Sequence, residues 1–343
     1  MVSIKKQFMM NKPKIAVVMS VYNGEKYLKE QIDSILSQNE VDVKLYIRDD
    51  GSSDSSCDIV KGYSDDRIVM MDSDSNIGVG RSFFTALFFA VNDEFQAEYF
   101  AFSDQDDIWL ADKLKVSVNQ ICNYQDPALY CSNLILYKNN KNEGLFLKQK
   151  PDFEGALEAI NKNKIAGCTM CFNRRLAKIL TDYPLPGDDI LNTRYHDTWV
   201  ILTSIVYAKI VYDSSSYILH RIHTNNEYGE GEPPVLKRAF KAVCFFVKGW
   251  FNFVFGKLKY KDFKTLSKNY SYRIGFGYLK RTCRYFLDIL NTYQGSDLKY
   301  IKMLADYQNS LKNRIAVIKN SNILKRKEES RLFFVFKVLI NFI

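Results

Sequence analysis

Three carboxylates crowd into four residues directly after an apolar run that resembles a strand. Residues 99–103 read YFAFS, and Asp104, Asp106 and Asp107 follow at once. Negative charges this close repel one another unless a cation or several strong hydrogen-bond donors neutralise them. Oxygen ligands favour hard ions such as Mg²⁺ or Mn²⁺ over softer metals. The cluster therefore predicts a divalent metal site that carries phosphate rather than a solvated loop.

The spacing within this cluster predicts different roles for its members. If strand geometry continues past Ser103, Asp104 and Asp106 point the same way and can share one ion. Asp107 then faces the other way and caps a helix expected over residues 109–118. The alternative is that the whole cluster is an acidic helix cap.

A second acidic pair, Asp49 and Asp50, ends an apolar run and precedes Gly51-Ser52-Ser53. The hydroxyls and amides of such a turn can accept a nucleotide, and a carboxylate there can take the N3–H of uracil or thymine. For one of the two aspartates, a turn that caps the next helix is an equally good interpretation. The chain has neither GxxxxGK[ST] nor a complete GxGxxG, which disfavours P-loop and dehydrogenase sites.

An acid beside an imidazole, His196-Asp197, begins an apolar segment far along the chain. A carboxylate held there could remove a proton from an acceptor hydroxyl. Of the three histidines, His220 and His223 lie close together further on. A neutral His223 could complete the metal shell, or it could be an ordinary surface residue.

Alternating strand and helix patterns place these clusters. We expect strands over residues 14–20, 43–47, 68–71, 99–103, 129–137 and 166–172, and helices over 25–37, 55–63, 82–92, 109–118 and 199–207. This alternation predicts an α/β fold with a mostly parallel central sheet flanked by helices. Ligands collect at the carboxyl ends of parallel strands, so the polar clusters should converge on one edge.

The charge is distributed unevenly along the 343 residues. Residues 235–343 contain 23 Lys and Arg against 6 Asp and Glu, whereas the rest contains 25 against 33. Aromatic residues surround Lys237, Lys241 and Lys248, a pattern typical of an amphipathic helix at an anionic membrane surface. An ordinary packed helix is the alternative. We expect an N-terminal extension (1–13), a catalytic domain (14–232) and a helical, basic and aromatic C-terminal extension (235–343) that binds membrane or acceptor but no nucleic acid.

The sequence features that depend on cellular location favour the cytoplasm. No apolar run reaches the length of a spanning helix, and the N-terminus lacks the apolar region of a secretory signal. Seven scattered cysteines suit a reducing compartment, with Cys168 and Cys171 interpreted as structural rather than as a redox pair. We therefore expect a cytoplasmic protein, peripheral at the inner face of a bacterial membrane.

Seven short motifs occur in order between residues 14 and 229. They are AVVMSVYNGE (16–25), RDDGSSD (48–54), NIG (76–78), SDQDDIW (103–109), AGCTM (166–170), HDTW (196–199) and RIHTNN (221–226). Together they resemble the family 2 inverting glycosyltransferases of GT-A fold, in particular the bacterial rhamnosyltransferase-like branch. Seven motifs in register are far more specific than any one alone.

The resemblance implies roles for individual residues. Asp104 and Asp106 match the DxD signature that binds the donor diphosphate through Mn²⁺ or Mg²⁺, His223 matches a metal- or diphosphate-contacting histidine, and Asp197 matches the catalytic base. The expected donor-binding residues are Ser20, Tyr22, Asn23, Glu25, Asp49, Asp50, Asn76, Gly78, Arg81 and Asp104. The expected acceptor-side residues are Gly167, Cys168, Thr169, His196, Trp199, Arg221 and Asn225.

The resemblance also implies an activity. His196 replaces a more widespread acid before the base, as in the rhamnosyltransferase-like branch, and the QxxRW motif of processive synthases is missing. We expect non-processive transfer of one sugar, with rhamnose as the first candidate, from a dTDP- or UDP-sugar to a lipid-linked saccharide in cell-surface polysaccharide synthesis. The alternatives are a nucleotidyltransferase or phosphotransferase with the same metal site, and a sugar-nucleotide-binding module without turnover.

Overall fold

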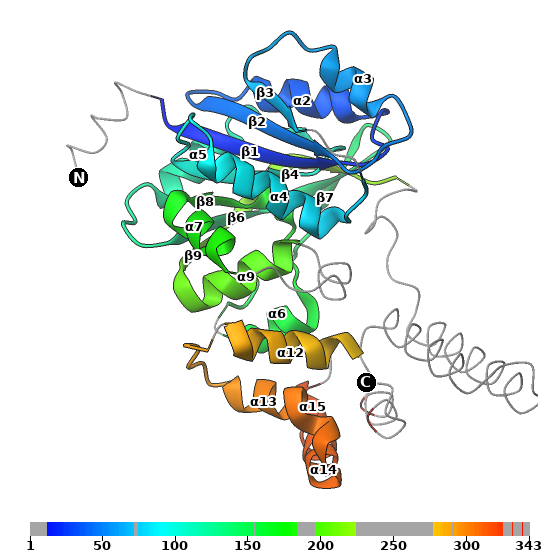
Figure 1. The fold of residues 1–343 in the computed structure, drawn as a ribbon, viewed down its shortest axis with the longest axis vertical. Helices are drawn as coiled ribbons and strands as arrows, with labels where there is room; N and C mark the ends of the chain where they lie inside the picture. The colour runs from blue at the N-terminus through cyan, green and yellow to red at the C-terminus, as the bar shows by residue number, and fades with distance from the viewer. Residues whose placement is uncertain are drawn as a thin grey trace, which may run out of the picture. The chain divides into compact units, whose positions relative to one another are not determined.

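The computed structural model describes residues 12–71, 75–153, 155–183, 196–223, 277–289 and 291–324, together with residues 331 and 338. The chain divides into two compact units (Figure 1). The first unit comprises Met1–Phe153, Asn163–Leu185 and Arg194–Asn225, and the second comprises Glu154–Lys162, Pro186–Thr193 and Asn226–Ile343. The first unit contains the seven sequence motifs, apart from the last residue of the motif at 221–226.

A nine-stranded sheet forms the first unit. Its strands are β1 (Lys14–Val21), β2 (Asp42–Asp49), β3 (Ile68–Met71), β4 (Tyr99–Ser103), β5 (Ile108–Trp109), β6 (Ala128–Lys138), β7 (Lys141–Leu145), β8 (Cys171–Asn173) and β9 (Lys209–Arg221). The order is β3-β2-β1-β4-β8-β6-β9-β5, with β7 paired to β6. The strands β3, β2, β1 and β4 are mutually parallel. This arrangement confirms the predicted α/β class, and β8 introduces antiparallel pairing into the second half.

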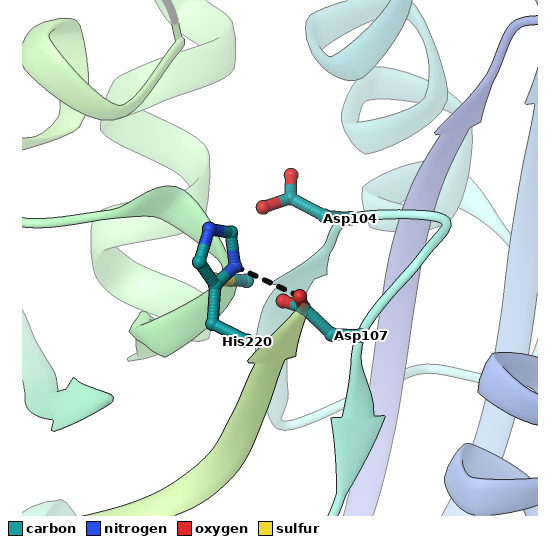
Figure 2. Close-up of side chains that lie close together, drawn as sticks. Asp104, Asp107 and His220 are labelled. Carbon is teal, nitrogen blue, oxygen red and sulfur yellow. Dashed lines mark hydrogen bonds and ion pairs between the residues drawn. The ribbon is translucent and has the colours of Figure 1, made fainter. Parts of the chain in front are cut away.

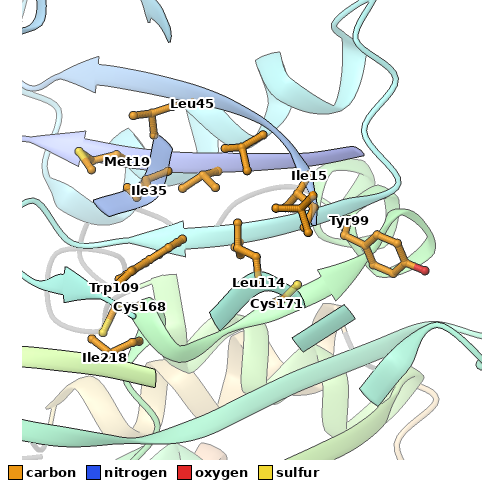
Figure 3. Close-up of a cluster of buried hydrophobic side chains, with 14 of the residues drawn as sticks. Ile15, Met19, Ile35, Leu45, Tyr99, Trp109, Leu114, Cys168, Cys171 and Ile218 are labelled. Atoms are coloured by element: carbon orange, nitrogen blue, oxygen red, sulfur yellow. The ribbon is translucent and has the colours of Figure 1, made fainter. Parts of the chain in front are cut away.

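Helices cover both faces of the sheet (Figure 1). They include α2 (Leu28–Leu36), α3 (Ser56–Lys61), α4 (Val79–Asn92), α5 (Lys113–Ile121), α7 (Arg174–Asp182) and α9 (His196–Tyr207). In β1, Ile15, Val17 and Met19 join one buried cluster with residues of α2 and α5 (Figure 3). The alternate residues Ala16 and Val18 are also fully buried. A continuous apolar run predicts this burial on both faces of a parallel strand.

Several elements differ from the sequence prediction, including β7, α6 (Ala156–Lys162) and α7, which were not predicted. The helix expected over 109–118 begins instead at Lys113, because Ile108 and Trp109 form β5 and pair with β9. The strand expected over 166–172 is a 3₁₀ turn, η1 (Gly167–Thr169), followed by β8. The long strand β9 was not predicted at all. Its polar stretch Asp213–Ser216 coincides with a register shift against β6, so a simple apolar alternation is absent there.

The described part of the second unit is helical. It contains α6 (Ala156–Lys162), α12 (Gly277–Ile289), α13 (Leu298–Asp306), α14 (Leu311–Lys319) and α15 (Ser321–Leu324). The Tyr293 hydroxyl accepts a hydrogen bond from the Ala156 amide at 3.1 Å and donates one to Asp297 at 2.5 Å. Within the described segments, every helix is too short or too polar to cross a membrane. The basic aromatic segment around Lys237–Lys248 lies outside the described residues.

Asn173 should stabilise the junction of β8 and α7. Its Oδ1 accepts hydrogen bonds from the amides of Leu176 (3.1 Å) and Ala128 (3.2 Å), and it is 8% exposed. Asn173→Ala removes a helix cap and leaves a buried donor unpaired, so we expect the free energy of unfolding to fall by about 2–4 kcal/mol. Urea denaturation measures the loss. Asn92→Ala, which removes one exposed side-chain hydrogen bond, is the control and should cost under about 0.5 kcal/mol. Equal losses for the two variants would contradict this role.

Candidate active site

The polar clusters meet at one edge of the sheet, at the carboxyl ends of β1, β2 and β4. In the parallel registers Val21 lies opposite Asp49, and Met19 lies opposite Ser103. The segments that follow these strands, residues 22–25, 49–54 and 104–107, therefore adjoin one another. The predicted convergence of three sequence-distant clusters is present in the structure.

Hydrogen bonds that involve side chains join the loop after β1 to the loop after β2. The Asn23 amide donates to Ser52 Oγ at 2.9 Å, and Asn23 Oδ1 accepts from the Ser53 amide at 2.8 Å. Glu25 Oε2 accepts from the Ser55 amide at 3.0 Å. The carboxamide and carboxylate expected to bind donor therefore also hold these loops together.

The two aspartates of the second cluster have different surroundings. Asp50 pairs with Arg48 at 2.5 Å and accepts from the amides of Ile77 and Gly78, both at 2.9 Å. Asp49 Oδ2 accepts from the amides of Gly51 and Ser52 at 3.0 and 2.9 Å. Asp50 therefore fixes the loop that begins α4, whereas Asp49 closes its own turn.

The other expected donor residues lie around these loops. Ser20 Oγ donates to Ser82 Oγ at 2.7 Å, and Asn76 Oδ1 accepts from the Gly78 amide at 3.1 Å. Gly78 has a φ of 85°, which favours glycine, and precedes α4, where Arg81 is half-buried in the first turn. Tyr22 is 52% exposed, so its ring is accessible at the edge of the site.

The acidic turn after β4 contains a compact group of possible metal ligands. Asp104, Asp107, Cys168 and His220 each offer one ligand atom, and these atoms all lie within 4.8 Å of one another. Figure 2 shows the side chains of Asp104, Asp107 and His220 turned toward a common centre. His220 Nδ1 lies 2.8 Å from Asp107 Oδ1. Asp107 is completely buried, and its Oδ2 has no hydrogen-bond partner among the described residues.

Asp106 contacts a different histidine. Its Oδ2 lies 2.9 Å from His223 Nε2, and the His223 ring packs against Tyr27 at 5.1 Å between centroids. The prediction that Asp107 caps a helix is wrong, since Asp112 occupies that position before α5. That prediction assumed that the alternating side-chain directions of a strand continue past Ser103, but β4 ends at this residue. The structure thus groups Asp104 with Asp107 and pairs Asp106 with His223.

The electrostatics of the turn agree with the repulsion inferred from the sequence. Burial and the charges of Asp107 and Asp106 raise the pKa of Asp104 to about 7. Burial and Asp107 also raise the pKa of Asp106. Burial lowers the pKa of His220, but the charge and hydrogen bond of Asp107 outweigh it and raise the value to about 9. A bound cation would relieve this repulsion, so the donor set fits a divalent metal.

Gln105, between the paired aspartates, is a residue whose role the sequence analysis missed. Its Oε1 accepts from the Tyr22 amide at 2.8 Å, and its Nε2 donates to the Tyr22 carbonyl at 3.1 Å. A Cβ at Gly24 would lie 2.6 Å from this carboxamide. Gln105 therefore ties the acidic turn to the loop after β1, and its position inside the DQD sequence was the only available signal.

Most expected acceptor-side residues lie inside the protein. The His196 ring stacks on Phe83 at 3.7 Å and meets Phe102 edge-on at 4.8 Å. A Cβ at Gly167 would lie 2.1 Å from His196 Nε2. Cys168, Thr169, His196 and Trp199 are each at most 5% exposed. Their burial and the apolar packing around His196 make these residues a support behind the site, and their assignment to the acceptor side stays a prediction.

Two of the remaining expected residues, Asp197 and Arg221, lie on α9 and at the end of β9. Asp197 is half-buried in the first turn of α9, where its Oδ1 accepts from the Thr198 amide at 2.5 Å. Arg221 forms an ion pair with Glu30 and lies over the Tyr27 ring at 4.7 Å. Asn225 lies outside the described residues.

Comparison with known proteins identifies the domain that carries this site. Residues 16–179 match the sequence profile of glycosyl transferase family 2. This segment is a glycosyl transferase family 2 domain. Asp197 and His223 lie beyond the matched segment of this glycosyltransferase.

Two relatives illustrate the range of this family. The glycosyltransferase is 27% identical over 224 residues to the dTDP-rhamnosyl transferase RfbG of Shigella flexneri, covering 62% of this chain and 73% of RfbG. It is 30% identical over 164 residues to WfgD of Escherichia coli, described as UDP-Glc:alpha-D-GlcNAc-diphosphoundecaprenol beta-1,3-glucosyltransferase, covering 47% of this chain and 61% of WfgD.

A solved structure supports the fold. Residues 1–349 of S. aureus TarS, crystallised with UDP-GlcNAc, superpose with a TM-score of 0.51 at 15% identity, covering 96% of this chain and 89% of that crystallised segment. The glycosyltransferase therefore has the predicted GT-A fold.

His196 should make the protein sensitive to acid. Burial lowers the pKa of His196 to about 3, so the folded state keeps the ring neutral while the unfolded chain takes up a proton below about pH 6.5. Stability is then lost as the pH falls from about 6.5 toward 3. Between pH 6 and pH 4 we expect the free energy of unfolding to fall by about 2 kcal/mol more in the wild type than in His196→Leu. Urea denaturation at each pH measures this difference, and parallel pH profiles would contradict it.

Proposed function

We propose that this glycosyltransferase is a metal-dependent, inverting, non-processive enzyme that moves one sugar from a nucleoside diphosphate sugar to an acceptor hydroxyl. The observation that carries the proposal is the acidic turn at Asp104–Asp107, which meets two histidines at the carboxyl edge of the sheet. Ligands of open α/β sheets bind at this edge.

Asp106 and His223, together with Asp104, would hold a Mn²⁺ or Mg²⁺ ion in this proposal. Carboxylate oxygens and a neutral imidazole suit these metals, and the raised pKa of Asp106 marks a place where negative charge lacks compensation. When bound, such an ion supplies positive charge for the departing diphosphate. The loops after β1 and β2, including Tyr22 and Asp49, would hold the nucleoside.

Asp197 would act as the base. The neighbouring His196 ring packs on Phe102, two residues before Asp104, and therefore places the start of α9 beside the end of β4. Negative charge is stabilised in the first turn of a helix. The Asp197 carboxylate would take the proton of the acceptor hydroxyl while that oxygen bonds to the anomeric carbon. The bond from this carbon to the diphosphate then breaks with inversion.

Two donor classes follow from the relatives. RfbG is described as a dTDP-rhamnosyl transferase, which supports rhamnose from dTDP as the first choice. WfgD is described as using UDP-Glc, which supports a hexose from UDP as the second. Small changes in a sugar pocket can exchange donors, so a test of the donor must include both classes.

A lipid-linked saccharide would be the acceptor, in the synthesis of a cell-surface polysaccharide. The description of WfgD names a diphosphoundecaprenol acceptor. The excess of lysine and arginine in residues 235–343 fits attraction to the anionic inner face of the cytoplasmic membrane. We therefore assign catalysis to residues 14–232 and association with membrane or acceptor to residues 235–343.

Asp197→Asn should abolish most turnover but leave donor binding intact. An amide cannot accept the proton, and a positioned base contributes about 100- to 10,000-fold in rate. Single-turnover assays measure the rate, and calorimetry with the nucleoside diphosphate measures binding. Asp112→Asn, which changes an exposed carboxylate outside the site, is the control. Undiminished turnover in Asp197→Asn would refute the assignment.

A panel of sugar nucleotides should identify the donor. With a lipid-linked acceptor preparation, we expect release of nucleoside diphosphate that requires Mn²⁺ or Mg²⁺ and stops when EDTA removes the metal. Asp106→Asn should raise the metal concentration needed for half-maximal activity by about tenfold or more. Release of inorganic diphosphate instead would indicate a nucleotidyltransferase, and full activity in EDTA would exclude the metal.

A further inference from the structure

We propose that Asp107, Cys168 and His220, with Asp104, form a second metal site that takes a borderline ion such as Zn²⁺. This site differs from the Asp106 and His223 pair in its ligands and in its chemistry. It contains sulfur and nitrogen beside oxygen, a combination that selects zinc-like ions rather than Mg²⁺. The inference goes beyond the proposed transfer reaction.

The geometry of the four side chains is close to that of a metal centre. Their ligand atoms lie within 4.8 Å of one another, whereas ligands around a tetrahedral zinc ion are about 3.5 Å apart. Movements of about one ångström would therefore close the site. Asp104 and Asp107 follow β4, Cys168 lies in η1 and His220 lies near the end of β9. The group thus joins three segments that are distant in sequence.

One buried oxygen of the group, Asp107 Oδ2, points to a missing ligand. Asp107 is completely buried, yet its Oδ2 has no hydrogen-bond partner in the described residues. His220 Nδ1 and Asp107 Oδ1 lie 2.8 Å apart, so an ion between them would replace the proton that they share. Cys168 is also completely buried, whereas Asp104 and His220 are half-buried. The partial exposure of Asp104 and His220 would let an ion enter from this side.

Charge balance supports a divalent ion in this position. Two carboxylates and a thiolate carry three negative charges, and zinc would neutralise two of them. Lys113 provides a further positive charge from the protein interior, where its ammonium lies 3.5 Å from the centre of the Trp109 ring. It is 1% exposed, its Nζ has no hydrogen-bond partner among the described residues, and its charge acts on Cys168. Buried charges are tolerated when they balance in this way.

Such an ion would hold the ends of β4 and β9 together. These ends also carry Asp106 and His223, so the second site would position the proposed donor-metal ligands without itself touching the sugar. Asp104 is the one residue common to both sets. The expected effect is therefore a more stable site region, which can be measured without any substrate.

Cobalt substitution in the full-length protein tests the site directly. After removal of metals, Co²⁺ should produce the near-ultraviolet sulfur-to-cobalt charge-transfer band that reports a cysteine ligand. Cys168→Ser should abolish this band. Cys171→Ser should retain it, because Cys171 is equally buried in the same CxxC sequence but lies outside the group. The absence of the band in the wild type, or its persistence in Cys168→Ser, would overturn the proposal.

Two histidine variants separate this site from the donor metal and remain informative if Cys168→Ser does not fold. We expect His220→Gln to weaken Co²⁺ and Zn²⁺ binding by at least tenfold and to lose the rise in melting temperature that Zn²⁺ produces in the wild type. His223→Gln should retain both. Unchanged zinc stabilisation in His220→Gln would overturn the proposal. Because no donor or turnover is involved, failure of the proposed transferase reaction would leave these outcomes unaffected.

Discussion

The concentration of negative charge at the end of β4 is the constraint on which the rest of the site depends. Carboxylates at a buried strand end require compensation, because burial and mutual repulsion disfavour their ionised forms. The fold supplies His220 and His223 at the end of β9 and Lys113 at the start of α5. The long strand β9 and the short strand β5 are the elements that bring these groups together. The pairing of β5 with β9 thus places the compensating groups beside the acidic turn.

The loops around this charge are held by side chains that bind backbone groups. Gln105 pairs with both the amide and the carbonyl of Tyr22, and Asp50 accepts two amides of the loop before α4. Backbone groups that lie outside helices and strands still require partners, and here polar side chains supply them. Several residues expected to contact the donor therefore also position the loops, and a preorganised binding edge needs less ordering when a ligand arrives.

The parts of the fold with strong local signals were predictable. The apolar run of β1 predicted a strand buried on both faces, and the turn after β4 predicted the edge where polar clusters converge. Motifs in register identified the family, which the sequence profile confirms. In contrast, local sequence patterns did not predict β5, β9 or η1. A two-residue strand and a strand with an internal register shift are stabilised by their neighbours rather than by local propensity.

The sequence by itself determined the chemistry available to this protein: clustered carboxylates, a basic C-terminal region and the motifs of a glycosyltransferase. Only the tertiary structure decided which of these groups act together. It paired Asp106 with His223, buried Asp107 against His220 and enclosed His196 between Phe83 and Phe102. The physical reason is that residue type and spacing specify chemistry locally. Burial and partner choice depend on strand pairings between segments more than 100 residues apart, such as Asp107 and His220.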